Sequence, residues 1–558
     1  MKYTVLIDDR QYSSYKYVLH ESETKLDDKE NPLTTPPNNL FHGDVFDIHE
    51  NEVNILNSPT RQATYISGVL ILEGNRTYGR TENKKRLLYR VVPQQSYLPY
   101  FLVPYDIKPS FEKSLKNKYV LFKFDHWSDK HPRGLLTETL GDVDKLEAFY
   151  EYQLYSKSLN SSIKEITKLT QDYTKLHTVG EYTEIIKSNS DFKIEDKTHI
   201  ENIITIDPRN SVDFDDALSI NRINENESMV SCYIANVFVW LETFRLWNAF
   251  SNRVATVYLP DRRRPMLPNI LSDTLCSLRE GSRKFVISVD FYVKNGTIEK
   301  VEAGSSIIQI QRNFVYEDPE LLNNGTYQEL LKLTQEMNKY KTITSHQVVS
   351  YWMVETNKYF AQLMSKYNQG IYRTVKSTID SIVPETVVNE QTIQSWLSCS
   401  GQYIIGNNDS SQYTYMQITS PIRRLVDLLN QMMFLQVDLQ HTLSNDAVIF
   451  ITNWMNKLEY INSSIRSIRK LQTDCSLLYQ FTTNPELLQL SHEGIVFDKL
   501  EKNNGLFGYM VYLKKLKLLS RISTTTELEN NSTHMFKVYL FESEACTKKK
   551  IRLCLDRL

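Results

Sequence analysis

The segment ITIDPRNSVDFDDALSI brings four carboxylates within ten positions of one another: Asp207, Asp213, Asp215 and Asp216. Apolar residues stand on both sides of this group: Ile203, Ile204, Ile206, Ala217, Leu218 and Ile220. Like charges this close raise one another's pKa, so such a group is normally kept ionised by hard cations that take oxygen ligands. The sequence therefore predicts a cluster of carboxylates at the edge of a core, where it can bind cations.

The number of carboxylates suggests which cations. Mg²⁺ usually takes one or two protein carboxylates together with waters and substrate phosphate oxygens, so four carboxylates suit two Mg²⁺ or Mn²⁺ ions about 3.5–4 Å apart. Such a pair can stabilise the attacking and leaving oxygens in phosphodiester cleavage. A solvated acidic turn and a structural Ca²⁺ loop are the alternatives. The glycine and glutamate of an EF-hand are missing at the required spacing.

A second polar group lies in ITSPIRRLVDLLNQM. Ser420-Pro421 is a helix-start signal, which predicts that Arg423 and Arg424 fall in the first helical turn. Two arginines at a helix N-terminus can bind a phosphate and offset transition-state charge. The alternative is a salt bridge with Asp427, which is three or four residues further on.

Length and composition limit the class of protein. At about 150 residues per domain, 558 residues predict three or four folding units. A net charge of −2 means that any polyanion must be bound by a local basic patch. We find no apolar run of about 18 residues, which predicts a soluble intracellular protein, cytoplasmic or nuclear, without a membrane partner. The six cysteines form no CxxC pair and are expected to be free, buried thiols.

The distribution of turn signals and apolar runs predicts an order of domains. Residues 1–40 are expected to be a tail and linker, because they end in ENPLTTPPNN. Short β-rich runs predict small barrels over 41–105 and 106–190. A mixed α+β region, with a long helix near HQVVSYWMVETNKYFAQLMSKY, is expected over 191–485, and a last β-barrel over 490–558.

With these motifs in this order, the chain resembles the ribonuclease II superfamily. The aspartate motif of that family is present from Thr205 to Ala217, VYLPDR-x-x-PMLP and LCSL from Val257 to Leu278, and TSPIRR-x-x-DLL from Thr419 to Leu429. FKFDHWSDKHPRGLLTETLGDVD resembles the second cold-shock-type barrel of the exosome-nuclease branch. The resemblance implies two N-terminal cold-shock or OB-type barrels, an α+β RNB catalytic domain and a C-terminal OB-type barrel. About 40 residues precede the first predicted barrel, so no additional endonuclease domain is expected.

The resemblance also implies an activity: hydrolytic, metal-dependent 3′-to-5′ degradation of single-stranded RNA to nucleoside 5′-monophosphates. It implies that Asp207, Asp213 and Asp216 hold the metal ions, that Asp215 is the carboxylate most tied to the chemical step, and that Arg423, beside Arg424, holds the scissile phosphate. Tyr258 and Tyr316 match aromatic positions along the RNA path. Because the chain has 34 tyrosines, simple packing roles are the alternative for these two.

The chain departs from the family pattern at several positions. The family's HIADV reads Tyr233 to Val237 with Asn236 in place of the aspartate, and the acidic pair before Met353 reads Ser350-Tyr351. The histidine after DLL is Gln431. These departures keep two alternatives open: a non-catalytic RNA-binding relative with a decayed RNB domain, and a DNA-directed exonuclease. Membership of an RNA-decay complex is a further alternative, with a monomeric catalytic unit expected.

Overall fold

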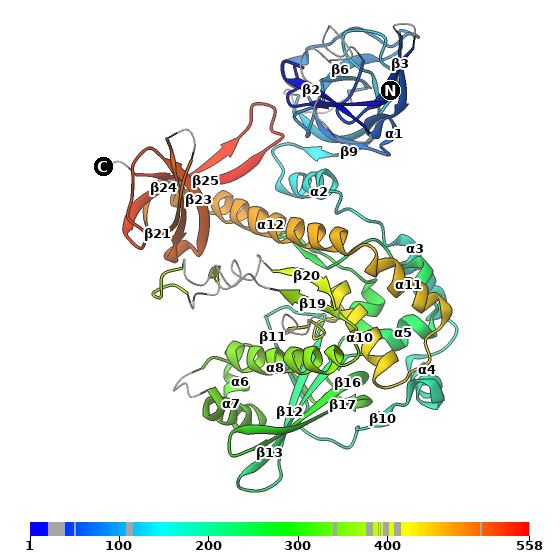
Figure 1. Ribbon diagram of the computed structural model, residues 1–558, viewed down its shortest axis with the longest axis vertical. Coiled ribbons are helices and arrows are strands. Elements are labelled where there is room, and N and C mark those ends of the chain that lie inside the picture. Colours follow the sequence, from blue (N-terminus) through cyan, green and yellow to red (C-terminus); the bar gives the residue numbers. More distant parts are fainter. Residues whose placement is uncertain are drawn as a thin grey trace. The chain divides into compact units, whose positions relative to one another are not determined.

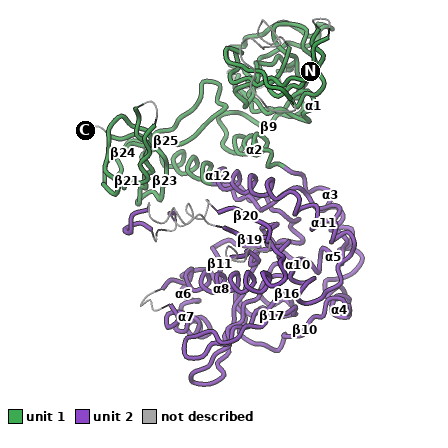
Figure 2. The backbone as a smooth tube through the Cα atoms, viewed as in Figure 1, with its two compact units in different colours: residues 1–160, 473–558 green, residues 161–472 purple. Residues whose placement is uncertain are grey.

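We analysed a computed structural model, which describes residues 1–20, 39–49, 52–107, 115–338, 343–374, 383–388, 390, 392–393, 401–406, 415–502 and 505–556. The chain forms two compact units: residues 1–160 with 473–558, and residues 161–472 (Figure 2). No helix among the described residues is long and apolar enough to cross a membrane. Five cysteines are described and none of them forms a disulfide: three are buried, Cys546 is half-buried and Cys554 is exposed, so the expectation of buried thiols is wrong at the last two. Cys399 lies outside the described residues.

The first unit begins with a four-stranded antiparallel sheet in the order β2-β1-β3-β4. The prediction of a tail over residues 1–40 is therefore wrong for its first half, whereas residues 21–38 lie outside the described part. In YTVLI, Val5 and Ile7 alternate with less buried residues and enter a small core with Tyr17 and Phe46. That short alternation is a strand signal which the polar surroundings hid. The strands are β1 (Tyr3–Ile7), β2 (Tyr15–Leu19), β3 (Val45–His49) and β4 (Glu52–Asn57).

A second antiparallel sheet in the same unit has the order β7-β6-β5-β8-β9. Because β5 pairs with β8, the predicted boundary between 105 and 106 is wrong: it cuts through one sheet. The predicted barrel over 106–190 is also wrong beyond residue 142, where three helices follow in place of strands. The elements of this part are α1 (Pro59–Gln62), β5 (Ile66–Leu70), β6 (Leu87–Pro93), β7 (Phe101–Tyr105), β8 (Lys118–Phe124), β9 (Gly134–Asp142) and α2 (Leu146–Ser156). Helices α3 (Lys164–Tyr173) and α4 (Val179–Ser188) belong to the second unit.

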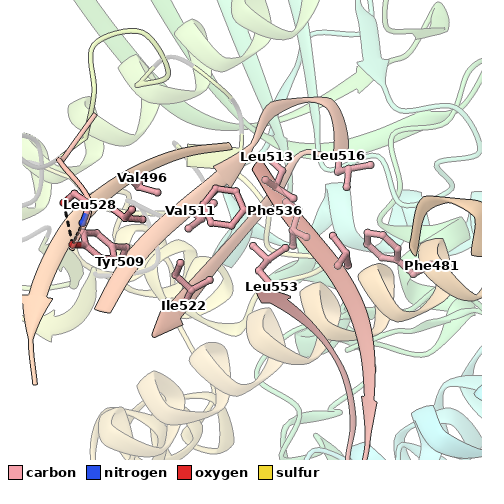
Figure 3. Packing of buried hydrophobic residues seen from close by; sticks show 12 residues of the cluster. Phe481, Val496, Tyr509, Val511, Leu513, Leu516, Ile522, Leu528, Phe536 and Leu553 are labelled. Atoms are coloured by element: carbon pink, nitrogen blue, oxygen red, sulfur yellow. Dashed lines mark hydrogen bonds between the residues drawn. The ribbon is translucent and has the colours of Figure 1, made fainter. Parts of the chain in front are cut away.

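The C-terminal part of the first unit is a five-stranded antiparallel barrel with the order β23-β22-β21-β24-β25, as predicted. Its core packs Val511, Leu513 and Phe536 together (Figure 3). Tyr509 places a hydroxyl in this core and satisfies it by donating to the carbonyl of Leu528 at 3.0 Å. The strands are β21 (Ser491–Glu501), β22 (Phe507–Leu513), β23 (Leu518–Thr524), β24 (Thr533–Glu542) and β25 (Lys549–Leu555).

The second unit is built on a seven-stranded mixed sheet with the order β10-β17-β16-β13-β12-β11-β18. The inner pairs are antiparallel, whereas β10 and β18 pair in parallel at the two edges. Two short ribbons lie outside it: β14 (Val257–Tyr258) with β15 (Arg263–Arg264), and β19 (Ile371–Thr374) with β20 (Gln402–Ile405). The sheet strands are β10 (Glu195–Asp196), β11 (Ile204–Asp207), β12 (Asp216–Arg222), β13 (Glu227–Ala235), β16 (Arg283–Lys294), β17 (Thr297–Gln309) and β18 (Arg312–Val315).

Helices complete the second unit (Figure 1). The predicted long helix is present as α8, which begins with a capping box formed by Thr344 and Gln347 and buries Val349, Phe360 and Met364 on one face. Helix α12 continues past residue 472 toward the C-terminal barrel. The helices are α5 (Val237–Thr243), η5 (Ile270–Leu275), α6 (Pro319–Leu322), α7 (Gly325–Asn338), α8 (Ser345–Ser365), α10 (Leu425–Val437), α11 (Asn445–Met455) and α12 (Leu458–Thr483).

Candidate active site

The four aspartates lie where two neighbouring strands of the seven-stranded sheet, β11 and β12, are connected. Asp207 ends β11 and Asp216 begins its antiparallel neighbour β12, so the intervening loop carries Asp213 and Asp215 between two core strands. Ser277 fixes this loop: its hydroxyl donates to the carbonyl of Val212 at 2.8 Å and accepts from the amide of Phe214 at 3.0 Å. The serine of the LCSL motif thus holds the loop that presents the carboxylates.

All predicted site residues line one cavity of about 750 Å³ in the second unit. The sequence prediction of a cluster is therefore borne out as a juxtaposition, whereas the role of each residue stays a prediction. The cavity also contains Arg263 and His346, which sequence reasoning missed. The predicted residues that line it are Asp207, Asp213, Asp215, Asp216, Tyr258, Tyr316, Arg423 and Arg424.

Asp215 and Arg423 form the central ion pair. The Nε of Arg423 donates to Oδ2 of Asp215 at 3.0 Å, and the amide of Ile422 donates to Oδ1 at 2.8 Å. Burial raises the pKa of Asp215 to about 8, and the charge of Arg423 opposes that rise. Asp215 is 2% exposed but the Arg423 side chain is 45% exposed. The guanidinium of Arg423 can therefore stay paired with Asp215 and still contact a ligand in the cavity.

Asp207 and Asp216 are half-buried acidic residues on the neighbouring strands β11 and β12. Burial, followed by the charge of Asp216, raises the pKa of Asp207 well above its usual value. Burial also raises the pKa of Asp216 to about 6, against the attraction of Arg423 and Arg424. Two half-buried carboxylates whose ionised forms are disfavoured are a donor set that a hard divalent cation would stabilise. The residues therefore fit such an ion, although no three His, Cys, Asp or Glu side chains in the described part of the chain are arranged to hold one as they stand.

Asp213 is engaged differently from the other three carboxylates. Its Oδ2 accepts a hydrogen bond from the hydroxyl of Tyr258 at 2.8 Å and lies 3.3 Å from NH1 of Arg263. Arg263 also forms an ion pair with Asp273 on η5. Oδ2 of Asp213, which the resemblance makes a metal ligand, thus already has two protein partners, Tyr258 and Arg263.

The two arginines of the TSPIRR motif differ in their partners: Arg424 forms the salt bridge with Asp427, whereas Arg423 pairs with Asp215 and faces the cavity. Arg424 donates from NH2 to Oδ1 of buried Asp427 at 2.7 Å, which is the salt bridge considered as the alternative. The predicted helix start is wrong: α10 begins at Leu425, and Arg424 has extended backbone because it forms a bridge with Ala255. Tertiary pairing overrides the Ser-Pro signal, and Arg423 lies in the turn before the helix.

The two predicted aromatic residues differ in how much of each ring is free to contact a ligand in the cavity. Tyr258 is 41% exposed, and its amide donates to Oε1 of Gln472 at 3.0 Å. The ring of Tyr316 stacks on His346 with the ring centroids 3.5 Å apart and the planes 11° from parallel. One face of Tyr316 is thus covered. His346 was missed because only the helical register of α8 turns it towards the cavity.

The departures from the family pattern fall mostly outside the cavity. Asn236 is 1% exposed and caps α5, where its Oδ1 accepts from the amide of Val239 at 3.4 Å. Asn236 does not line the cavity, so a direct role in tuning the active centre is not expected for it. Gln431 contacts the residue before Asn236: its Nε2 donates to the carbonyl of Ala235 at 2.9 Å. Ser350 does line the cavity, as a neutral residue at a position where the family pattern has an acidic one.

Comparisons with known proteins agree on one family. Residues 195–330 match the family model of the RNB domain. The chain is 29% identical over 225 residues to DIS3-like exonuclease 2 of Schizosaccharomyces pombe, which covers 38% of this chain and 23% of that protein. It is 32% identical over 139 residues to ribonuclease R of Mycoplasmopsis pulmonis, which covers 25% and 18%. The aligned part thus spans less than a quarter of either relative.

Two solved structures show the same fold. Ribonuclease R of Mycoplasma genitalium, solved with ribose methylated single-stranded RNA, has a TM-score of 0.67 at 14% identity, with 99% of this chain and 100% of that chain covered. Yeast Ssd1, a pseudonuclease, has a TM-score of 0.54 at 13% identity, with 93% and 78% covered. The multi-domain architecture, with N-terminal antiparallel sheets, an RNB domain and a C-terminal barrel along the chain, is therefore confirmed.

Proposed function

Because the chain carries an RNB domain and thereby belongs to the ribonuclease II superfamily, we propose that it is a metal-dependent 3′-to-5′ exoribonuclease. It would hydrolyse single-stranded RNA to nucleoside 5′-monophosphates. The observation that carries the proposal is the Asp215–Arg423 pair in the same cavity as Asp207 and Asp216. A charge-rich, partly desolvated site of this kind suits a reaction whose transition state carries negative charge on phosphate oxygens.

Asp207 and Asp216 would hold a divalent ion, Mg²⁺ or Mn²⁺, which when bound supplies charge neutralisation and a more acidic water. Asp215 orients Arg423 through Nε, and the hydroxyl of Ser420 accepts from NH2 of the same guanidinium at 3.0 Å. Held by both partners, Arg423 would receive a non-bridging oxygen of the scissile phosphate without reorganising. Asp213 would join the ligand set if a second ion binds.

The aromatic residues would guide the strand into this centre. Tyr258, exposed at the cavity wall, and Tyr316, backed by His346, offer π-faces to the terminal bases. Stacking on aromatic residues contributes about 1–3 kcal/mol per base and tolerates any sequence, which suits a nuclease that must accept every nucleotide. Arg424 is paired with Asp427 and would act on RNA by its nearby positive charge.

Two alternatives differ in outcome. A non-catalytic RNA-binding protein is suggested by the fold it shares with a pseudonuclease. A DNA-directed nuclease is suggested by Ser350, because a neutral side chain stands in the cavity where relatives carry an acid that helps recognise the ribose hydroxyl.

The test uses 5′-labelled single-stranded RNA and a matched deoxyribo-oligomer, each incubated with the full chain and Mg²⁺, with EDTA as the control. We expect an RNA ladder that shortens from the 3′ end and stops in EDTA. RNA that binds and stays intact in both Mg²⁺ and Mn²⁺ would instead support the pseudonuclease alternative. Faster shortening of the DNA than of the RNA would support the DNA-directed nuclease.

A further inference from the structure

Arg263 connects Asp213, which lines the cavity, with Asp273 on η5. It stands on β15 opposite Tyr258 in the two-stranded ribbon, so both side chains reach Asp213 from one scaffold. Its NH1 lies 3.3 Å from Oδ2 of Asp213, and its NH2 forms an ion pair with Asp273. The Arg263 side chain is 20% exposed and that of Asp213 is 8% exposed. Charged partners this far from bulk water interact more strongly than a surface pair does.

The carboxylates differ in what already neutralises them. Asp215 has Arg423 and a backbone amide, and Asp213 has Arg263 and a tyrosine hydroxyl. Asp207 and Asp216 instead form no ion pair with a basic side chain within 4 Å in the described part of the chain, because Arg423 pairs with Asp215 and Arg424 pairs with Asp427. A divalent cation gains most where negative charge is least compensated. At Asp213 it must compete with a guanidinium for the same oxygen.

We propose that Arg263 is an internal counter-ion of Asp213, so that the site binds divalent ions in two unequal steps. The first ion binds at Asp207 and Asp216. The second binds only as Asp213 turns away from Arg263 and Tyr258, and it is therefore held more weakly. This inference rests on the metal dependence in the proposed function, and it assigns a positioning role to Arg263.

Binding of Mn²⁺ to the RNA-free full chain tests the inference, measured by calorimetry and by the electron paramagnetic resonance signal of free Mn²⁺. In Arg263→Gln, we expect the second ion to bind about tenfold more tightly, because the competing charge is gone, while the first constant is unchanged. Asp273→Asn should have the opposite effect, because Arg263 is then left entirely to Asp213. Arg262→Gln is the matched control: Arg262 is on the same turn, its side chain is 68% exposed and it lies 3.9 Å from Asp261. It should change neither constant.

The outcomes separate this inference from the proposed function. Two wild-type binding steps that Arg263→Gln and Asp273→Asn leave unaltered would overturn the role of Arg263 and leave the nuclease proposal intact. No Mn²⁺ binding by the wild-type chain would overturn both. If Arg263→Gln fails to fold, Tyr258→Phe replaces it, since that change removes only the hydroxyl that donates to Asp213. Tyr258→Phe should increase the affinity for the second Mn²⁺ ion by a smaller factor. An unchanged second binding constant would count against the inference.

Discussion

Arg423 donates from Nε to Oδ2 of Asp215 across 3.0 Å, although 208 positions separate the two residues in the chain. The pair joins the loop before β12 to the turn before α10. Neither residue is well placed without the other, since Asp215 is buried and needs a cation, and Arg423 needs a fixed anchor to face the cavity. Chemistry at this centre should therefore depend on both members.

Asp215→Asn should abolish hydrolysis and leave RNA affinity largely intact. The amide keeps the shape of the carboxylate but removes its charge, so Arg423 loses the partner that orients it. We expect a fall in the single-turnover rate of about 10³-fold or more, in the range found when a preorganised electrostatic contact is lost. Rates on labelled RNA and equilibrium binding in EDTA measure the two effects separately. Unchanged turnover would remove Asp215 from the mechanism.

Arg423→Lys should also be severely impaired, even though it keeps the charge. A lysine has one ammonium group and cannot donate to Asp215, to Ser420 at 3.0 Å and to a phosphate in the fixed directions of a guanidinium. We expect a rate loss of about 10²-fold, with KM changed far less. Arg245→Lys, at an exposed position, is the control and should retain wild-type kinetics. Equal loss in both variants would indicate a general effect of arginine replacement.

How far the sequence predicts this site depends on where its residues come from. The aspartates and Arg423 stand in compact motifs, so all of them could be named before their convergence was known. Arg263 could not, because it occupies a variable position of the VYLPDR-x-x-PMLP motif and its role depends on Asp213 and Asp273 lying beside it.

The fold shows the same division between local and tertiary information. The C-terminal barrel and α8 carry strong local patterns and were predicted. The first sheet was missed, because β1 is only five residues long and pairs with β3, some forty positions away across residues whose sequence reads as a linker. The start of α10 was misplaced because the bridge from Arg424 to Ala255 is a tertiary contact that no local signal reports.

Asn236 should prove a structural residue. Asn236→Ala removes the cap of α5 and the bond from Nδ2 to the hydroxyl of Ser305, which spans 3.3 Å. We expect a loss of stability of about 1 kcal/mol with cleavage rates within about twofold of wild type. Thermal melting and single-turnover kinetics measure the two quantities. A large rate effect without destabilisation would restore the idea that this position tunes the active centre.

Gly494→Ala should destabilise the C-terminal barrel. A Cβ at this position would lie 2.5 Å from Cδ2 of Leu513 and 2.9 Å from atoms of both Val511 and Phe536, all within the core shown in Figure 3. Forcing an atom into a packed core typically costs about 1–3 kcal/mol. Hydrogen exchange of the β21 and β22 amides should accelerate accordingly. Gly304→Ala is the control, because a Cβ there meets no atom within 4 Å.

His441 should make the protein less stable in mild acid. Its ring is 3% exposed, neither ring nitrogen has a hydrogen-bond partner in the described part of the chain, and the neighbouring charges are Lys193 and Asp191, with Phe192 against the ring. Burial, reinforced by Lys193, lowers the pKa of His441 from 6.5 to about 4. Between these values the unfolded chain binds a proton that the folded chain does not.

Stability from this group is therefore fully present above pH 6.5 and is lost progressively as the pH falls towards 4, by up to about 3 kcal/mol. His441→Leu removes the titrating ring at similar volume, so its melting temperature should fall less than that of the wild type between pH 7 and 4.5. His49→Gln, whose side chain is 77% exposed in the parent, is the control and should follow the wild type. Parallel curves for His441→Leu and wild type would show that the buried imidazole does not contribute to acid sensitivity.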